Sequence, residues 1–127
     1  MTGPMHVNEL LNLKGRRALI TGSGQGIGQG IARRLAQAGA YVILHGRKDT
    51  TALRDLSQEL NALPGGSGLI LADLSTSQGC AALMKEVQDT YGRLELLINN
   101  AADQGNTALY DIDPDSVTAM LSTNVAA

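Results

Sequence analysis

A chain of 127 residues in which 43 % are hydrophobic has room for one domain with a modest core. A net charge of −2 and an aromatic content of 2 % give no reason to expect binding to nucleic acid or to an anionic membrane. The sequence has no apolar run of the roughly 20 residues that a bilayer span needs, and no signal-peptide pattern at its start. Its one cysteine, Cys80, cannot form an intrachain disulfide. We therefore expect a cytoplasmic protein without a metal site.

Four short runs of residues are continuously apolar, which is the pattern of strands that are covered on both faces. They lie at 18–21, 41–44, 69–72 and 94–98. Longer segments with helical periodicity separate them. This alternation predicts an α/β fold with a doubly wound parallel sheet, right-handed crossovers and helices on both faces. We expect the domain at residues 15–127, after an N-terminal arm of residues 1–14 with one short helical turn around 8–13.

The helices between the strands are predicted from apolar side chains at spacings of three and four. The first helix carries Ile27, Ile31, Leu35 and Ala38 and ends at Gly39, and the second carries Leu53, Leu56, Leu60 and Leu63 and stops at 64–66. The third is predicted to begin at Ser75, an N-cap with Gln78 completing a capping box, and to carry Cys80, Leu83, Met84, Val87 and Tyr91. This pattern favours Cys80 as a small core hydrophobe over a reactive thiol.

A glycine-rich segment, Thr21-Gly-Ser-Gly-Gln-Gly-Ile-Gly28, leads from the first strand directly into the first helix. It contains neither a literal G-x-G-x-x-G nor the Lys-Ser/Thr of a Walker loop, but Gly22, Gly26 and Gly28 form G-x-x-x-G-x-G. Such glycines permit a sharp turn and bring backbone N–H groups close to a pyrophosphate at the positive end of a helix. The alternative is a tight turn that serves only strand–helix packing.

The segment from Thr21 to Gly28 resembles the cofactor-binding signature of the classical short-chain dehydrogenases/reductases, and three further elements follow in the family's order. Asp73-Leu74 closes the third strand, where the family's Asp contacts the adenine amino group. Asn99-Asn-Ala-Ala102 closes the fourth strand and is similar to the family's Asn-Asn-Ala-Gly. Asn124 matches the Asn of the family's Asn-Ser-Tyr-Lys catalytic group. The resemblance implies a Rossmann-type sheet that is truncated after the fourth strand and the helix that follows it.

The resemblance also implies which residues contact the cofactor. These are Thr21, Gly22, Ser23, Gln25, Gly26, Ile27, Gly28, Arg47, Lys48, Asp73, Leu74, Asn100, Ala101 and Ala102. Two structural alternatives stay open: Asp73 could cap the turn into the third helix, and Asn99 and Asn100 could be simple turn formers. In the family the first Asn of the pair steadies neighbouring strands and the second lies beside the cofactor ribose. Ala102 replaces the family's glycine, which affects the expected backbone geometry near the nicotinamide.

The choice between NADP and NAD depends on the end of the second strand. NAD-preferring relatives carry a carboxylate there for the ribose 2′-hydroxyl, whereas a 2′-phosphate needs a cation. This sequence has Gly46, which we expect to leave open the space that the carboxylate would fill, and then Arg47, with Lys48 as helper. Gln25 stands where strongly NADP-selective relatives often have a second basic residue. We therefore expect NADP in preference to NAD, with a solvated basic turn as the alternative.

Asn124 lies in a predicted helix that is entered through Asp113 and Pro114. Its amide shares an apolar stripe, so it must find hydrogen-bond partners. It either fixes the local backbone or holds a functional water, and the resemblance favours the second, a catalytic role. The family's catalytic Ser and Tyr-x-x-x-Lys are absent from these 127 residues, since none of Tyr41, Tyr91 and Tyr110 has a lysine four residues on. We therefore expect a fragment of a roughly doubled-length enzyme, inactive alone.

The resemblance implies hydride transfer between NADP(H) or NAD(H) and a small-molecule ketone or secondary alcohol, by a homodimer or homotetramer. The run at 15–22 and the ending His-Gly-Arg47 are similar to gluconate 5-dehydrogenases and 3-oxoacyl reductases, and the substrate stays open. A rival hypothesis is a non-catalytic dinucleotide-binding module that senses redox cofactor or pairs with another subunit. A plain structural α/β domain would require every motif match to be accidental.

Overall fold

The computed structural model describes residues 6–102 and residue 115. In chain order its elements are α1 (Val7–Leu10), β1 (Arg17–Ile20), α2 (Gly26–Gln37), β2 (Tyr41–Gly46), α3 (Thr51–Asn61), β3 (Ser67–Leu71), α4 (Ser77–Tyr91) and β4 (Leu96–Ile98). The predicted helix around Asn124, with Asp113 and Pro114 at its start, lies outside the described residues, as does Tyr110.

The sheet is parallel throughout and has the order β3-β2-β1-β4. Leu19 in β1 is in register with Ile43 of β2 and with Leu97 of β4. The strand order therefore runs outward in both directions from β1. In such sheets the crevice between the two strands where the order reverses is the usual ligand site.

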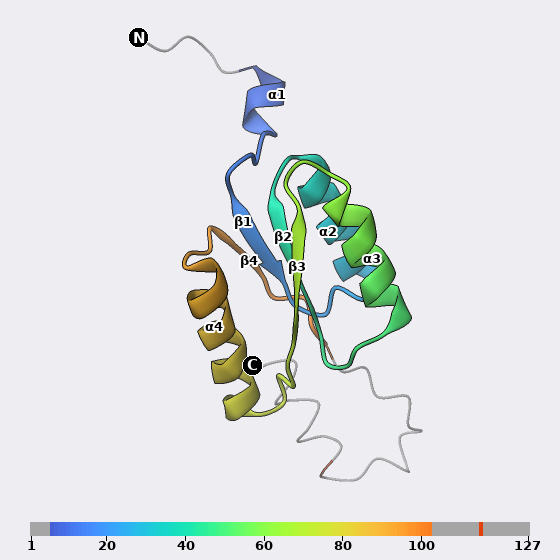
Figure 1. Ribbon diagram of the computed structural model, residues 1–127, viewed down its shortest axis with the longest axis vertical. Coiled ribbons are helices and arrows are strands. Elements are labelled where there is room, and N and C mark those ends of the chain that lie inside the picture. The colour runs from blue at the N-terminus through green and yellow to red at the C-terminus, as the bar shows by residue number, and fades with distance from the viewer. Residues whose placement is uncertain (1–5, 103–114, 116–127) are drawn as a thin grey trace.

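Helices cover both faces of this sheet, with α2 and α3 on one side and α4 on the other (Figure 1). Two hydrophobic clusters form the core. Ala18 and Ile20 belong to the one on the α2–α3 face, with Leu56 and Leu60. Leu19 belongs to the other, with Ile43, Ile70, Leu83 and Val87. Successive residues of a strand thus enter two different cores, which explains why the strands are apolar at every position. The predicted fold class is confirmed.

Two predictions about helix faces are wrong. Ile27 is 77 % exposed and Met84 is 45 % exposed. The residues that α2 buries are small ones, Gly28, Ala32 and Ala36, which let the helix lie close to the sheet. Ile27 stands in the first turn of α2, at the rim of a cleft.

The predicted cap of the third helix is also wrong by one residue. Thr76 is the N-cap of α4, and its Oγ1 accepts a hydrogen bond from the Gly79 N–H at 3.0 Å. Ser75 instead donates from its backbone N–H and its hydroxyl to Asp73 Oδ1. Because both hydrogen bonds of Ser75 go to the Asp73 carboxylate, its hydroxyl does not cap the helix, and Thr76 is the N-cap instead.

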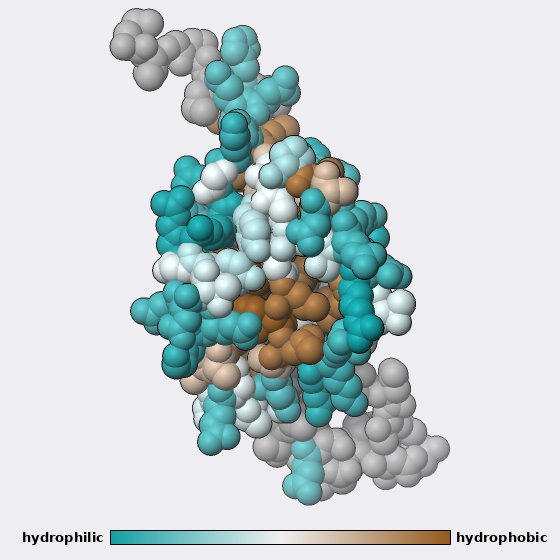
Figure 2. All heavy atoms as spheres, viewed as in Figure 1, coloured by the Kyte–Doolittle hydropathy of each residue, from teal (hydrophilic) through white to brown (hydrophobic). Residues whose placement is uncertain are grey.

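Strand boundaries differ slightly from the apolar runs. β2 extends through His45 to Gly46, and β3 starts at Ser67, because the ladder pairs Val42 with Ser67 and Gly46 with Leu71. β4 covers only Leu96–Ile98, although the Glu95 N–H still donates to the Arg17 carbonyl. The space-filling view shows apolar side chains in the middle of one face, surrounded by hydrophilic ones (Figure 2).

Candidate functional site

A cleft of about 1070 Å³ lies at the carboxyl ends of the strands. Its lining comes from the end of β2 and from the segments that follow all four strands: Gly22, Gly24, Gln25, Gly26, Ile27, His45, Gly46, Arg47, Lys48, Thr50, Ala52, Leu53, Ala72, Asp73, Leu74, Asn100, Ala101 and Ala102. Most of the residues predicted to contact a cofactor therefore meet in one place. Thr21, Ser23 and Gly28 do not line the cleft and lie behind it, buried.

The glycine loop, residues 21–28, needs glycine at each position of the motif for a different reason. Gly22 and Gly26 have positive φ angles of 63° and 58°, which other residues rarely adopt. A Cβ on Gly22 would also lie 2.8 Å from the Ala101 Cα. A Cβ on Gly28 would overlap the Asn100 side-chain amide and lie 2.5 Å from the Gly22 carbonyl oxygen. The loop is therefore packed directly against the segment that follows β4.

Thr21 and Asn100 hold these two segments together. The Thr21 Oγ1 accepts hydrogen bonds from the backbone N–H groups of Asn100 and Ala101, at 3.0 and 2.9 Å. The Asn100 Nδ2 donates to the Gly22 carbonyl at 3.1 Å. Both side chains thus fix the shape of the glycine loop from behind, and the amide of Asn100 has a structural partner at the rim of the cleft.

Ser23 and His45 form a second link, between the glycine loop and β2. The His45 N–H donates to Ser23 Oγ at 2.8 Å, and the His45 carbonyl accepts from the Ser23 N–H at 2.9 Å and from its hydroxyl at 3.2 Å. Ser23 is fully buried and His45 is 3 % exposed. Sequence reasoning gave His45 no role. The available signal was a titratable side chain near the end of an otherwise apolar strand.

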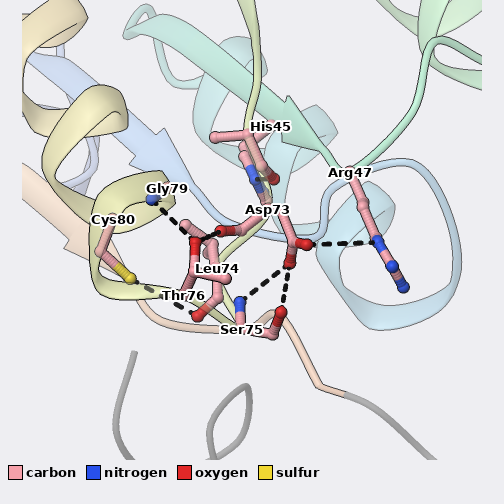
Figure 3. A network of polar contacts seen from close by, with 9 residues as sticks. His45, Arg47, Asp73, Leu74, Ser75, Thr76, Gly79 and Cys80 are labelled. Atoms are coloured by element: carbon pink, nitrogen blue, oxygen red, sulfur yellow. Dashed lines mark hydrogen bonds and ion pairs between the residues drawn. The ribbon is translucent and has the colours of Figure 1, made fainter. Parts of the chain in front are cut away.

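Asp73 closes the turn after β3 and also faces Arg47 (Figure 3). Its Oδ1 accepts from the Ser75 N–H at 3.0 Å and from the Ser75 hydroxyl at 2.6 Å. The hydrogen bonds from Ser75, with a smaller contribution from the Arg47 charge, lower the pKa of the Asp73 carboxyl. Asp73 is therefore an ionised acceptor at neutral pH. Its turn-closing role does not exclude a contact with adenine, because Ser75 uses Oδ1, and among the described residues Oδ2 has no hydrogen-bond partner and only the 4.0 Å ion pair with Arg47.

Arg47 stands at the mouth of the cleft with its side chain 72 % exposed, and its Nε lies 4.0 Å from the Asp73 Oδ2. Lys48 follows it and is exposed. An ion pair at this distance and exposure holds the guanidinium only weakly. The Arg47 fork is therefore available for an anion that enters the cleft.

The expectation that Gly46 leaves an open space for a carboxylate is wrong. A Cβ on Gly46 would overlap the Cδ1 of Leu53, which is 2 % exposed. Leu53 projects from the first turn of α3 into this position and also lies 3.1 Å from a Cβ placed on Gly24. The sequence has no carboxylate at position 46, and the packing of Leu53 leaves no room for one.

The tyrosines of the described part do not contribute to the cleft. Tyr41 begins β2 and Tyr91 ends α4, and their ring centroids lie 5.5 Å apart. Burial and the contact with Tyr41 raise the pKa of the Tyr91 phenol above its usual value, so it stays protonated. The Arg17 guanidinium donates to the Tyr91 carbonyl, which ties α4 to the start of β1. This cluster is structural.

Among residues 6–102 and 115, no three His, Cys, Asp or Glu side chains are grouped as metal ligands would be. No helix in that part of the chain is long and apolar enough to cross a membrane. Cys80 is half-buried, and its Sγ donates weakly to the Leu74 carbonyl at 3.5 Å. Asn124, the predicted catalytic residue, lies outside the described residues.

Comparison with known proteins agrees with this geometry. The family model "short chain dehydrogenase" matches residues 16–127. A D-beta-hydroxybutyrate dehydrogenase of Cupriavidus necator is 33 % identical over 120 residues, which is 91 % of this chain and 44 % of the relative. A rhamnolipid-biosynthesis 3-oxoacyl-[acyl-carrier-protein] reductase of Pseudomonas aeruginosa is 36 % identical over 116 residues, again 91 % of this chain and 44 % of the relative.

A solved structure of a 3-oxoacyl (acyl-carrier-protein) reductase from Agrobacterium tumefaciens, with NADP bound, matches with a TM-score of 0.84 and 34 % identity, covering 96 % of this chain and 46 % of that one. The chain belongs to the short-chain dehydrogenase family. It spans a little under half the length of these relatives.

Proposed function

We propose that this chain forms the cofactor-binding half of an NADP-dependent oxidoreductase, with residues 15–127 as the binding domain and residues 1–14 as an arm. The observation that carries the proposal is that the glycine loop at the start of α2 faces Arg47 and Asp73 across one cleft. A dinucleotide needs both features: amides at a helix N-terminus for its pyrophosphate and a polar rim for its adenosine. The NADP bound in a structural relative supports the same assignment.

Each cofactor contact follows from chemistry at the cleft. Backbone N–H groups of Gly24 to Ile27 serve the pyrophosphate, because those of Gly22 and Ser23 donate to His45. The Arg47 fork, helped by Lys48, clamps the ribose 2′-phosphate through charge-assisted hydrogen bonds. Asp73, held ionised by Ser75, accepts from the adenine amino group. NAD is the weaker ligand, because NAD-preferring relatives bind the free ribose 2′-hydroxyl with a carboxylate at the position of Gly46. In this chain Leu53 fills the space that such a side chain would need.

The reaction proposed for the whole enzyme is hydride transfer between the nicotinamide of the cofactor and the carbon of a ketone or secondary alcohol. Family resemblance assigns proton transfer to a tyrosine aided by a lysine, and Asn124 to the catalytic group. A Tyr-x-x-x-Lys motif is absent from the 127 residues. Binding, rather than turnover, is therefore the activity to measure on this chain. Turnover of carbonyl substrates by full-length material would support the enzyme, and cofactor binding without turnover would favour the non-catalytic module.

We also place the enzyme in the cytoplasm as a homodimer or homotetramer. The lone cysteine and the small net negative charge support the location. The apolar strand β4, an edge strand of the described sheet with Leu97 47 % exposed, supports burial against further structure. Sedimentation velocity would show a species of two or four subunits, and a monomer at micromolar concentration would contradict the assembly.

The test of the proposed function is a calorimetric titration with NADP⁺ and NAD⁺. The unaltered protein should bind NADP⁺ more tightly than NAD⁺. Arg47→Ala should weaken NADP⁺ binding about tenfold, since one exposed charge-assisted contact contributes about 1.4 kcal/mol, and should leave NAD⁺ binding within about twofold. Arg54→Ala is the matched control: this exposed arginine pairs with Asp49 and does not line the cleft. An unchanged NADP⁺ affinity in Arg47→Ala would exclude the proposed clamp.

A further inference from the structure

His45 is a buried titratable side chain to which the proposed hydride transfer assigns no role. It lies near the end of β2, 3 % exposed, where the segments after β1 and β3 come together. Its Nδ1 lies 3.0 Å from the Gly22 backbone nitrogen, and its Nε2 lies 2.9 Å from the Ala72 carbonyl oxygen. The imidazole therefore connects the first glycine of the loop to the residue that precedes Asp73.

These two contacts define the protonation state of the ring. A backbone N–H can only donate, so Nδ1 must be the unprotonated acceptor; a carbonyl can only accept, so Nε2 must carry the proton. Only the neutral Nε2–H tautomer satisfies both partners. A proton added at Nδ1 would turn the Gly22 contact into two donors facing each other in a buried position.

We propose that His45 is a positioning residue that holds the glycine loop in its cofactor-binding shape only while the imidazole is neutral, so that dinucleotide affinity falls at acid pH. The inference rests on the proposed function, because it concerns the same cleft. Gly22 is also held by Asn100 through its carbonyl, so its peptide units are fixed from both sides. Loss of the His45 acceptor frees the N–H side and lets the loop turn away from the pyrophosphate.

The charged groups near His45 act in opposite directions: the cations Arg47 and Lys48 favour the neutral imidazole, and the Asp73 carboxylate favours the protonated one. Arg47 and Lys48 follow the end of β2, and Asp73 follows the end of β3. His45, Arg47 and Asp73 lie close together (Figure 3), while the glycine loop contributes no ionisable side chain. Burial lowers the pKa of His45 from its ordinary 6.5, although the Ala72 contact raises it in part. The pKa of Asp73 is also lowered, so its carboxylate stays ionised while His45 titrates.

The test uses NAD⁺ as the probe, because the 2′-phosphate of NADP⁺ itself titrates near pH 6. Between pH 7.5 and pH 5.0 the dissociation constant should rise more than about threefold. The rise should stay below the about 30-fold that an unshifted histidine would give if only its neutral form bound. The sign follows from the lowered pKa: binding is constant above pH 6.5 and weakens as the proton is taken up below it.

Two variants separate the two ring contacts. His45→Asn keeps an oxygen near the position of Nδ1 and cannot titrate, so it should bind NAD⁺ within about threefold of the unaltered protein at pH 7.5 and show a flat pH profile. His45→Gln keeps a donor near the position of Nε2 but cannot reach Gly22, so it should bind at least about fivefold more weakly at every pH. His6→Asn, which changes an exposed histidine that does not line the cleft, is the matched control and should keep the original profile.

Circular dichroism at each pH confirms that the variants stay folded. An unchanged pH profile in His45→Asn, or full affinity in His45→Gln, would overturn the positioning role while leaving cofactor binding intact. Absence of NADP⁺ and NAD⁺ binding at every pH would instead overturn the proposed function, and the inference with it.

Discussion

Replacing Gly28 with alanine should damage the site through one added methyl group. The new Cβ would overlap the Asn100 Nδ2 and lie 2.5 Å from the Gly22 oxygen, the two ends of a 3.1 Å hydrogen bond. Real Cβ atoms do not approach backbone oxygen this closely, so the bond must break and the loop must shift. Loss of the bond costs about 1 kcal/mol and overpacking about 2 kcal/mol, against a gain of about 1 kcal/mol for alanine in a helix.

The net loss of stability in Gly28→Ala is therefore about 2 kcal/mol, or a fall in melting temperature of about 8 °C for a domain of this size. Thermal unfolding followed by circular dichroism measures it. Gly30→Ala is the matched control in the same helix: a Cβ there meets nothing within 4 Å, so it should stabilise by up to about 1 kcal/mol. If both variants shift the melting temperature in the same direction, the close approach between α2 and the loop is wrong.

Two further substitutions test packing around the site. Gly46→Asp should lower the free energy of unfolding by about 1–3 kcal/mol, because the new side chain would overlap Leu53. In a urea-unfolding double-mutant cycle, the loss in Gly46→Asp/Leu53→Ala should be at least about 1 kcal/mol smaller than the sum of the two single losses. Simple additivity would mean that the two positions do not touch. Thr76→Ala should lower the free energy of unfolding by about 1 kcal/mol, because the N-cap of α4 is lost. Gln78→Ala should change it by no more than about 0.5 kcal/mol. Equal losses of the two variants in thermal unfolding would support the predicted capping box at Ser75 and Gln78 instead.

The sequence predicted the sheet and most of the cleft because both depend on local patterns. Uninterrupted apolar runs require two covered faces, and the glycine spacing before α2 requires a tight turn at the strand end. Since parallel strands end at the same edge, Arg47 and Asp73 could be placed near each other without knowledge of side-chain positions.

The features that sequence reasoning missed depend on contacts between distant segments. Leu53 looked like a core residue of α3, and nothing local indicated that it would fill the space beside Gly46. His45 lies 23 residues from Gly22 in the chain, and only the sheet register brings its ring to that N–H. The shift of the N-cap from Ser75 to Thr76 has a similar cause, the competing carboxylate of Asp73.

The most direct test of the account is to follow the backbone amide resonances of the chain while NADP⁺ is added. We predict that the largest shift changes fall on residues 22–27, 47–48, 73–74 and 100–102, which are the segments that line the cleft. Amides at the opposite end of the sheet, such as Tyr41 and Tyr91, should not move. A saturating titration with no change in the glycine loop, or with changes concentrated at that opposite end, would contradict the claim that this cleft is a dinucleotide site.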